Sequence, residues 1–418
     1  MNDKQSRRAF LQKTALISGG LFLGSHFPDV RALADEQDET ADRVKLGVIG
    51  TGSRGKYLMR HINLIPGVDI VAVCDNYAPH LEEGVKMTGG RAEAFTDYRK
   101  MLSASSIDGV IIATPLYLHS VMTVDALKAG KHVFCEKAMA KTPAQCLEMF
   151  NARESAGKIL LIGHQRMFNP RYLKAFEMIN RGRLGDVTQI RAYWHRNNDW
   201  RRNVPEPSLE RHINWRLYWD YSEGLMTELG SHQIQVANFI KKDFPRSVSG
   251  TGSINYWHDG REVFDNVNLV YEYPDRSTLI YDSMISNAHY GLEEQIMGPK
   301  GTMELEYGRL YSENPPPAPG ILQLLNNIEH KIFDPLPLGG KSWIPETASE
   351  NKGEYIYGVD LDDDGSALEM EGFVRMIREN RHSDVLLREA YYAAIASVLG
   401  NEAIKKGEVL PFPEKFIL

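Results

Sequence analysis

A glycine-rich loop between an apolar run and an amphipathic stretch constrains the fold of this chain more than any other feature. Gly50, Gly52 and Gly55 form the pattern G-x-G-x-x-G at the end of the apolar run Lys45–Gly50. The first glycine permits a tight turn, the second lets a ligand approach the backbone, and the third lets a helix pack closely on a strand. The pattern predicts a strand, a turn and a helix whose N-terminus binds an anion.

Apolar runs and helix-length stretches alternate from residue 44 to about residue 165. The runs are Lys45–Gly50, Asp69–Cys74, Gly109–Thr114, His132–Cys135 and Ile159–Gly163. Runs nearly continuous in Val, Ile and Leu are typical of parallel strands buried on both faces. We therefore expect an α/β fold whose N-terminal domain, residues 44–165, is a Rossmann doubly wound parallel sheet that binds a dinucleotide.

After about residue 185 the apolar residues recur with a period of two. The runs are Val187–Arg196, Val248–Trp257, Val267–Tyr273, Ser277–Ser283, Gln295–Met297 and Thr302–Tyr307. This pattern predicts a C-terminal α+β domain, residues 166–418, with an open and mainly antiparallel sheet. Tyr273-Pro274-Asp275-Arg276 would be a turn between two strands. Residues 313–366, rich in Pro and Gly, are expected to form an irregular excursion, and Ser366–Asn380 and Leu387–Lys406 the closing helices.

Asp75 ends the second apolar run and bears on the choice of cofactor. A carboxylate at this point accepts hydrogen bonds from the ribose hydroxyls of a nicotinamide dinucleotide and repels a 2′-phosphate. The neighbours Asn76 and Tyr77 offer no guanidinium to such a phosphate. The predicted cofactor is therefore NAD rather than NADP, with Ser53 and Arg54 of the glycine loop beside its pyrophosphate.

The first residues have the pattern of a twin-arginine export signal. Arg7-Arg8 precedes an apolar stretch from Ala15 to Ser25 and an A-x-A-like cleavage site at Ala32-Leu33-Ala34. The stretch is shorter than the roughly 20 residues of a membrane span. We expect residues 1–34 to be a cleaved signal peptide, with an uncleaved anchor as the alternative. Because the twin-arginine export machinery carries folded proteins, the cofactor could travel inside to the periplasm or another extracytoplasmic compartment.

Charge and cysteine content exclude other classes of protein. The net charge of -7 without a basic stripe argues against a nucleic-acid partner. Cys74, Cys135 and Cys146 are odd in number and are not a disulfide framework. Cys74 and Cys135 lie at the ends of apolar runs and are expected to be small buried hydrophobic residues. No metal site is predicted.

Two further motifs carry a family resemblance. Ala113-Thr114-Pro115 is followed by His119, and Glu136-Lys137 comes at the end of the next apolar run. Together with the glycine loop, this spacing resembles the Gfo/Idh/MocA family, named after glucose–fructose oxidoreductase and inositol dehydrogenase. The resemblance covers roughly residues 44–310 and the final helices.

The resemblance implies roles for these residues. Thr114, Pro115, His119, Glu136 and Lys137 would lie at the cofactor, and Lys137 would also touch the reacting hydroxyl as a catalytic residue. A partly desolvated lysine can polarise an alcohol or share its proton. The family usually reads Glu-Lys-Pro, whereas this chain has Ala138, which puts the turn and any cis peptide at this point in question.

A second cluster contains Glu228 and His232. The family has a carboxylate four residues before a catalytic histidine, so the resemblance implies that His232 is the general base and Glu228 its partner. On a helix this spacing places both residues on one face, where the carboxylate would orient the imidazole and stabilise the imidazolium. Gln235 stands where family members often have Asp.

Three segments rich in aromatic and hydrogen-bonding residues are candidates for binding a carbohydrate: residues 164–170, 193–202 and 214–221. Apolar sugar faces stack on rings, and hydroxyls need paired donors and acceptors. The candidate substrate-binding residues are Gln165, Arg166, His195, Trp215 and Tyr218. Arg166 fits a structural ion pair equally well, and the aromatic residues fit a core or an interface. By resemblance, a homo-oligomer formed through the open sheet face is expected.

These motifs predict an NAD-dependent oxidoreductase that takes hydride from a secondary hydroxyl of a sugar, glycoside or cyclitol. Outside the cytoplasm a carried NAD would have to be regenerated within the same site. One alternative is a redox-neutral NAD-dependent glycoside hydrolase or lyase with a transient 3-keto intermediate, like the family 109 glycoside hydrolases, whose Tyr-containing motif has no obvious copy here. The second alternative is a non-catalytic nucleotide-binding protein, a decay that Ala138 and Gln235 would fit.

Overall fold

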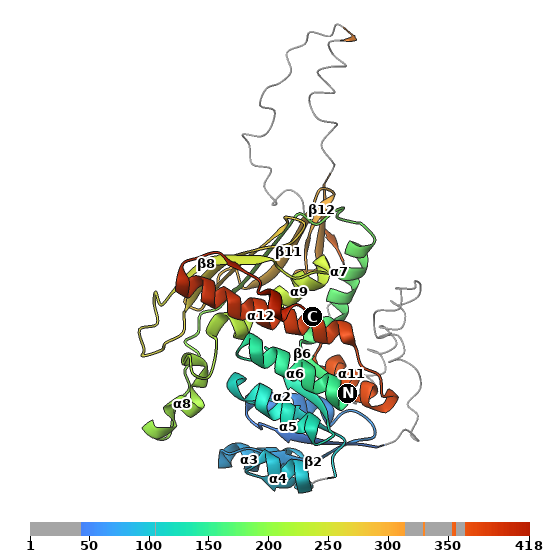
Figure 1. The fold of residues 1–418 in the computed structure, drawn as a ribbon, viewed down its shortest axis with the longest axis vertical. Coiled ribbons are helices and arrows are strands. Elements are labelled where there is room, and N and C mark those ends of the chain that lie inside the picture. Colours follow the sequence, from blue (N-terminus) through green and yellow to red (C-terminus); the bar gives the residue numbers. More distant parts are fainter. Residues whose placement is uncertain (1–42, 105, 314–328, 331–352, 357–363) are drawn as a thin grey trace, which may run out of the picture.

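The computed structural model describes residues 43–104, 106–313, 329–330, 353–356 and 364–418. In this part of the chain two β-sheets, each with its own helices, are stacked one above the other along the long axis of the molecule (Figure 1). The expected signal peptide, residues 1–34, and most of the expected excursion at 313–366 lie outside the described residues. None of the described helices is both long and apolar enough to cross a membrane.

The first sheet has six parallel strands in the order β3-β2-β1-β4-β5-β6. The strands are β1 (Val44–Ile49), β2 (Val68–Cys74), β3 (Glu93–Phe95), β4 (Gly109–Ile112), β5 (His132–Glu136) and β6 (Leu160–Gly163). The strand order reverses between β1 and β4, the point at which such sheets bind ligands beyond the carboxyl ends of their strands. The predicted Rossmann sheet is confirmed; β3, with three residues, was too short to be predicted.

Helices cover both faces of this sheet. They are α2 (Ser53–Ile62), α3 (Ala78–Met87), α4 (Tyr98–Ala104), α5 (His119–Lys128) and α6 (Pro143–Ala156), with the 3-10 turn η2 (Leu116–Leu118) before α5. The strands β4 and β5 are buried along their whole length, as their continuous apolar runs predicted. All three cysteines are buried and free.

The second sheet has nine strands in the order β14-β13-β12-β11-β7-β10-β9-β8-β15. They are β7 (Gln189–His195), β8 (Ser247–Ser253), β9 (Asn266–Glu272), β10 (Thr278–Met284), β11 (Leu292–Gly298), β12 (Gly301–Glu304), β13 (Arg309–Ser312), β14 (Glu354–Tyr355) and β15 (Leu410–Pro411). The neighbours pair antiparallel except β7 and β10, which are parallel. The sheet is therefore mixed rather than a simple meander, because β7 is inserted between β10 and β11.

In this sheet one predicted strand is shorter than expected, and one predicted turn is confirmed. The predicted strand Val248–Trp257 ends at Ser253, because the amides of Asn255, Tyr256 and Trp257 turn to donate to the carboxylate of Asp265. The predicted turn after Tyr273 does join β9 to β10.

The other helices in the described part of the chain follow β6 in the sequence. They are η3 (Gln165–Phe168), α7 (Pro170–Asn180), η4 (Pro207–Leu209), α8 (Glu210–Ile213), η5 (Trp215–Leu217), η6 (Met226–Gly230), α9 (Ser231–Lys241), α11 (Ser366–Glu379), α12 (Asp384–Lys406) and η8 (Glu414–Phe416). Of these, α11 packs on α2, whereas α12 packs on α9 and β8 of the second sheet and on α6 of the first (Figure 1). The closing helices, predicted from their periodicity, thus hold the two sheets together.

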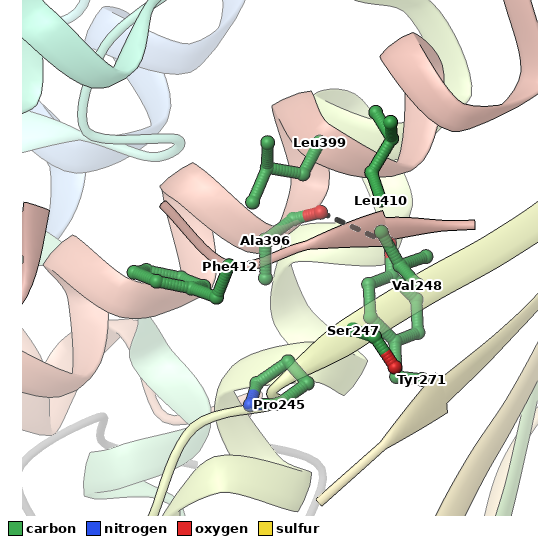
Figure 2. Close-up of a pocket in the computed structure, with 8 residues that line it drawn as sticks. All are labelled: Pro245, Ser247, Val248, Tyr271, Ala396, Leu399, Leu410 and Phe412. Carbon is green, nitrogen blue, oxygen red and sulfur yellow. Dashed lines mark hydrogen bonds between the residues drawn. The ribbon is translucent and has the colours of Figure 1, made fainter. Parts of the chain in front are cut away.

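The contact between α12 and the second sheet is apolar. Leu399 of α12, Val248 of β8 and Phe412 line a shallow pocket there, and the Tyr271 hydroxyl donates to the main-chain oxygen of Ala396 at 3.2 Å (Figure 2). This pocket lacks the charged groups that a hydride-transfer site needs, so it is part of the packing.

Candidate active site

The glycine loop joins β1 to α2 at the switch point of the first sheet. Gly50 has a φ of +88°, and a Cβ atom there would lie 2.6 Å from the main-chain oxygen of Ala113. A Cβ on Gly55 would lie 1.9 Å from the main-chain oxygen of Gly50. A Cβ on Gly52 would lie no closer than 3.5 Å to any neighbouring atom, the nearest being in the His80 ring, which is an ordinary van der Waals contact. The protein itself does not require a glycine at Gly52, so this glycine leaves room for the close approach of a ligand.

The N-terminus of α2 is free to bind an anion. Its N-cap residue is Gly52, no side chain caps it, and its first turn has no acidic residue. Amide groups at such an end and the helix dipole favour a pyrophosphate. Arg54, predicted to add charge to the pyrophosphate, instead lies 2.5 Å from the carboxylate of Glu136. This ion pair ties α2 to the end of β5.

Asp75 follows β2 and faces the same loop. Its carboxylate accepts hydrogen bonds of 2.9 Å from the amides of Thr51 and Tyr77. Burial favours a higher pKa for Asp75, but the hydrogen bonds from His80, Tyr77 and Thr51 outweigh it and lower the pKa. The side chain is therefore a carboxylate at neutral pH, as the discrimination against a 2′-phosphate requires.

His119 holds the loops around the cofactor position together. Its Nδ1 lies 2.9 Å from the main-chain oxygen of Ala138 and its Nε2 lies 3.0 Å from that of Thr114. His119 thus contacts the backbone of two loops at the position that the resemblance implied for the cofactor. Thr114 Oγ1 is buried without a hydrogen-bond partner among the described residues, which fits a polar ligand there. Pro115 begins the turn η2.

Lys137 extends from the end of β5 toward the second sheet. The peptide bond between Lys137 and Ala138 is cis, although alanine replaces the proline of the family motif. The ammonium nitrogen of Lys137 donates to the main-chain oxygen of Glu228 at 2.6 Å. Burial lowers the pKa of Lys137 below its usual value, while Glu228 and Glu136 oppose this shift. A lysine in this setting can share a proton with a substrate oxygen.

Glu228 lies in the π-helical turn η6, directly before α9. Its carboxylate accepts a hydrogen bond of 2.7 Å from Nε of Arg216, instead of orienting His232 as predicted. In a π-helical turn the backbone bonds run from i to i+5, so residues four apart do not stack as they do on an α-helix. Burial favours a higher pKa for Glu228, but Arg216 and Lys137 prevail and lower it.

His232 is in the first turn of α9 and is 4% exposed. Its ring centroid lies 5.6 Å from that of Trp194 and 5.6 Å from that of His164. Nδ1 of His232 is buried without a hydrogen-bond partner among the described residues. Burial, assisted by the positive charges of Lys137 and Arg166, lowers the pKa of His232 well below 6.5. The imidazole is therefore neutral at neutral pH and can accept a proton.

The crossover after β6 contains Gln165 and Arg166. Arg166 forms ion pairs with Glu294 at 2.9 Å and Glu306 at 3.3 Å. The structural ion pair, one of the two interpretations left open by the sequence, is therefore the one found. Gln165 Oε1 is buried without a partner among the described residues and is available to a ligand.

The other three predicted substrate-binding residues are engaged within the second domain. His195 Nε2 contacts the carboxylate of Asp282 on the neighbouring strand β10. The Tyr218 hydroxyl donates to Glu210 at 2.7 Å. The guanidinium carbon of Arg216, the partner of Glu228, lies 4.2 Å from the centroid of the Trp215 ring, over its face. His195 thus joins β7 to β10, and Tyr218 is held to α8. Of the three, only Trp215 is linked by a described contact, through Arg216, to Glu228.

Residues 199–221 reach from the second sheet to the glycine loop. The Arg202 guanidinium donates to the Ser53 hydroxyl at 3.3 Å, at the first residue of α2. The ring of Tyr221 lies 5.0 Å from that of Tyr117, and the ring of His212 lies 6.3 Å from that of Tyr77. This segment therefore contacts three loops that follow strands of the first sheet.

Three residues of the site lie in the predicted candidate segments but were not singled out there: His164, Arg202 and Arg216. His164 had a signal, since it directly follows a strand of the first sheet, on the side where ligands bind. The two arginines had none, because their contacts with Ser53 and Glu228 depend on the course of residues 199–221.

Comparison with known proteins settles the family. A family model described as "Oxidoreductase family, NAD-binding Rossmann fold" matches residues 44–164, and one described as "GFO/IDH/MocA C-terminal domain" matches residues 172–304. The chain belongs to the Gfo/Idh/MocA family. It is accordingly an oxidoreductase whose Rossmann fold binds NAD, as the glycine loop and Asp75 predicted.

The curated relatives include a dehydrogenase and a glycosyl hydrolase. Inositol 2-dehydrogenase of Klebsiella pneumoniae subsp. pneumoniae is 28% identical over 266 residues, 63% of this chain and 74% of that protein. A glycosyl hydrolase family 109 protein of Shewanella pealeana is 28% identical over 236 residues, 52% of this chain and 51% of that protein.

Solved structures share the fold. Scyllo-inositol dehydrogenase from Lactobacillus casei, with bound NAD(H) and scyllo-inositol, has a TM-score of 0.65 at 19% identity, covering 88% of this chain and 99% of that chain. The WlbA dehydrogenase from Bordetella pertussis, in complex with NADH and UDP-GlcNAcA, has a TM-score of 0.68 at 17% identity, covering 89% of this chain and 98% of that chain.

Proposed function

We propose that this protein removes hydride from a secondary hydroxyl of a carbohydrate (a sugar, a glycoside or a cyclitol) with NAD as the acceptor. The observation that carries the proposal is geometric: the ammonium nitrogen of Lys137 lies 2.6 Å from the main-chain oxygen of Glu228, in the turn that leads directly into the helix with His232. His232 is a buried base that Lys137 helps to keep neutral, and Lys137 is a buried ammonium held by the Glu228 carbonyl. Oxidation of an alcohol needs these two groups, one to take the proton and one to bind the oxygen.

The proton and hydride have separate destinations. NAD, when bound, accepts the hydride from the carbon of the alcohol. His232 takes the hydroxyl proton as the C–O bond becomes a carbonyl. Lys137 donates a hydrogen bond to the same oxygen and stabilises the negative charge that develops on it. The Glu228 carboxylate, paired with Arg216, opposes the effect of burial on the pKa of Lys137 and so favours the ammonium form.

The proposal is tested with purified protein and excess NAD, following absorbance near 340 nm over a panel of inositols, methyl glycosides and nitrophenyl glycosides. We expect reduction of NAD with at least one compound, and loss of about two or more orders of magnitude in rate in His232→Asn. His382→Asn, an exposed histidine beside Asp384, is the matched control. Absence of reduction across the panel, or an unchanged rate in His232→Asn, would overturn the proposal. Release of nitrophenol without net reduction would favour the redox-neutral hydrolase instead.

We further propose that the chain is exported by the twin-arginine route and retains its NAD for recycling within the site. The signal pattern of residues 1–34 motivates export. Retention is supported by residues 199–221, which join the second domain to the glycine loop through Arg202 and Ser53. Protein recovered from the extracytoplasmic fraction should release about one equivalent of NAD(H) on denaturation after extensive dialysis. Protein confined to the cytoplasm would contradict export, and an empty site would contradict retention.

A further inference from the structure

We infer that the substrate carries a second hydroxyl on a carbon adjacent to the one oxidised, and that His164 is the residue that binds it. This inference rests on the proposed function, because it concerns the same site. It assigns His164 a role in recognising a vicinal diol, in addition to the groups that perform hydride transfer.

The first observation is the state of the His164 side chain. His164 directly follows β6 and is 1% exposed. Both of its ring nitrogens are buried without a hydrogen-bond partner among the described residues. Buried polar groups in folded proteins are almost always paired, because an unpaired one loses its hydration without compensation. Two such atoms on one ring, with no partner among the described residues, are what a site that binds a polar ligand would present.

The second observation is the position of this ring beside the general base. The ring centroids of His164 and His232 are 5.6 Å apart, and the ring planes are inclined at 82°. Nδ1 of His232 also lacks a partner among the described residues, as does Oε1 of the adjacent Gln165. The unpaired atoms therefore belong to neighbouring side chains where η3, which begins directly after His164, packs on α9. Hydroxyl oxygens on adjacent carbons lie about one hydrogen-bond length apart, a span that two imidazoles at this separation can serve.

The third observation is the charge state of the ring. Burial, together with the positive charges of Lys137 and Arg166, lowers the pKa of His164 to about 3. The neutral ring has one N–H donor and one acceptor nitrogen. A hydroxyl group likewise donates once and accepts, so it matches either nitrogen. The neutral ring offers no opposite charge to an anionic or cationic substituent, so it suits a hydroxyl group better than either.

The test uses the carbohydrate that reduces NAD fastest in the panel, together with its two analogues deoxygenated at the carbons on either side of the oxidised one. Wild-type protein should use one analogue with kcat/KM lower by about tenfold to a hundredfold, since the analogue leaves His164 unpaired. In His164→Phe, which keeps an aromatic ring and removes both nitrogens, the diol should lose the same factor and the analogue should lose little. The preference for the diol would then disappear.

Other outcomes are distinguishable. If His164→Phe lowers kcat equally for diol and analogue, His164 only positions His232 and the inference is wrong. It is equally wrong if the variant retains the full preference. The NAD dissociation constant of the variant, measured by fluorescence titration, should equal that of the wild type, and His382→Phe should change nothing. If His164→Phe does not fold, His164→Asn takes its place, and it should retain part of the preference because it keeps a donor and an acceptor. If no carbohydrate reduces NAD, the proposed function itself has failed.

Discussion

The ammonium nitrogen of Lys137 lies 2.6 Å from the main-chain oxygen of Glu228. Lys137 directly follows β5, whereas Glu228 belongs to the turn η6 that leads into α9 and His232. This hydrogen bond therefore joins the nucleotide-binding sheet to the helix that carries the base. One contact fixes the ammonium group and the imidazole with respect to each other.

Lys137→Met should lower kcat by about a hundredfold to ten-thousandfold, because it removes the ammonium group while keeping a long apolar stem. Steady-state kinetics with NAD and the responding carbohydrate measure this. Lys174→Met, on a half-exposed lysine paired with Glu177, is the control and should retain full activity. Full activity in Lys137→Met would show that the hydrogen bond to Glu228 serves stability only.

The acid limb of the pH–rate profile should lie below pH 6.5. Burial, followed by the charges of Lys137 and Arg166, lowers the pKa of His232, so the base stays deprotonated as the pH falls through 6.5. Lys137→Met should move the residual acid limb toward higher pH, since it removes one of the charges that depress the pKa. Profiles of kcat/KM for both proteins check this. A wild-type limb at or above 6.5 would contradict the assignment of His232.

Asp75→Asn should weaken the preference for NAD over NADP by about tenfold or more, because it removes the charge that repels a 2′-phosphate and keeps an acceptor for the Thr51 amide. Fluorescence titration with both nucleotides measures the two dissociation constants. Asp69→Asn, on the strand β2 that precedes Asp75 but paired with Arg43 at the surface, should leave the preference unchanged. An unaltered ratio in Asp75→Asn would mean that another residue selects the nucleotide.

Arg202→Gln should accelerate NAD dissociation by roughly tenfold, because Arg202 places a positive charge beside Ser53 at the N-terminus of α2. The effect should weaken at high salt, and stopped-flow displacement of NAD measures it. Arg211→Gln, which removes an exposed arginine of the same segment paired with Glu262, is the control. Equal dissociation rates in wild type and Arg202→Gln would remove the support that this segment gives to cofactor retention.

Glu389→Gln should stabilise the folded protein at alkaline pH. Burial, together with Asp243, raises the pKa of Glu389 from 4.5 to about 8. Between these values the unfolded chain releases a proton that the folded chain keeps, so the free energy of unfolding falls as pH rises. Glutamine removes this loss of stability, which above pH 8 amounts to about 5 kcal/mol at most. Urea unfolding at acidic and alkaline pH checks it, with the half-exposed Glu402→Gln as control; a difference that is equal at both pH values would refute it.

The features that the sequence predicted are those encoded by residues close together in the chain. The glycine loop, Asp75 and the apolar strands of the first sheet follow from local pattern, and the structure contains them. The parallel pairing of β7 with β10 could not be predicted, because it depends on strands far apart in the sequence.

The same distinction applies to the site. His232 and Lys137 were found through motifs, and both lie where the two sheets meet. The partner of Glu228 was predicted wrongly, because neither the π-helical turn nor Arg216 has a local signal. The two open interpretations of Arg166 could be decided only when Glu294 and Glu306 were located beside it.

The measurement that tests the account most directly follows a hydrogen atom from substrate to cofactor. Protein loaded with NAD is mixed for a single turnover with the responding carbohydrate, deuterated at every carbon. The nucleotide is then released by denaturation, and its mass is determined. The account predicts reduced NAD carrying one deuterium. Reduced NAD without deuterium would contradict direct hydride transfer from the carbohydrate, and with it the proposed function.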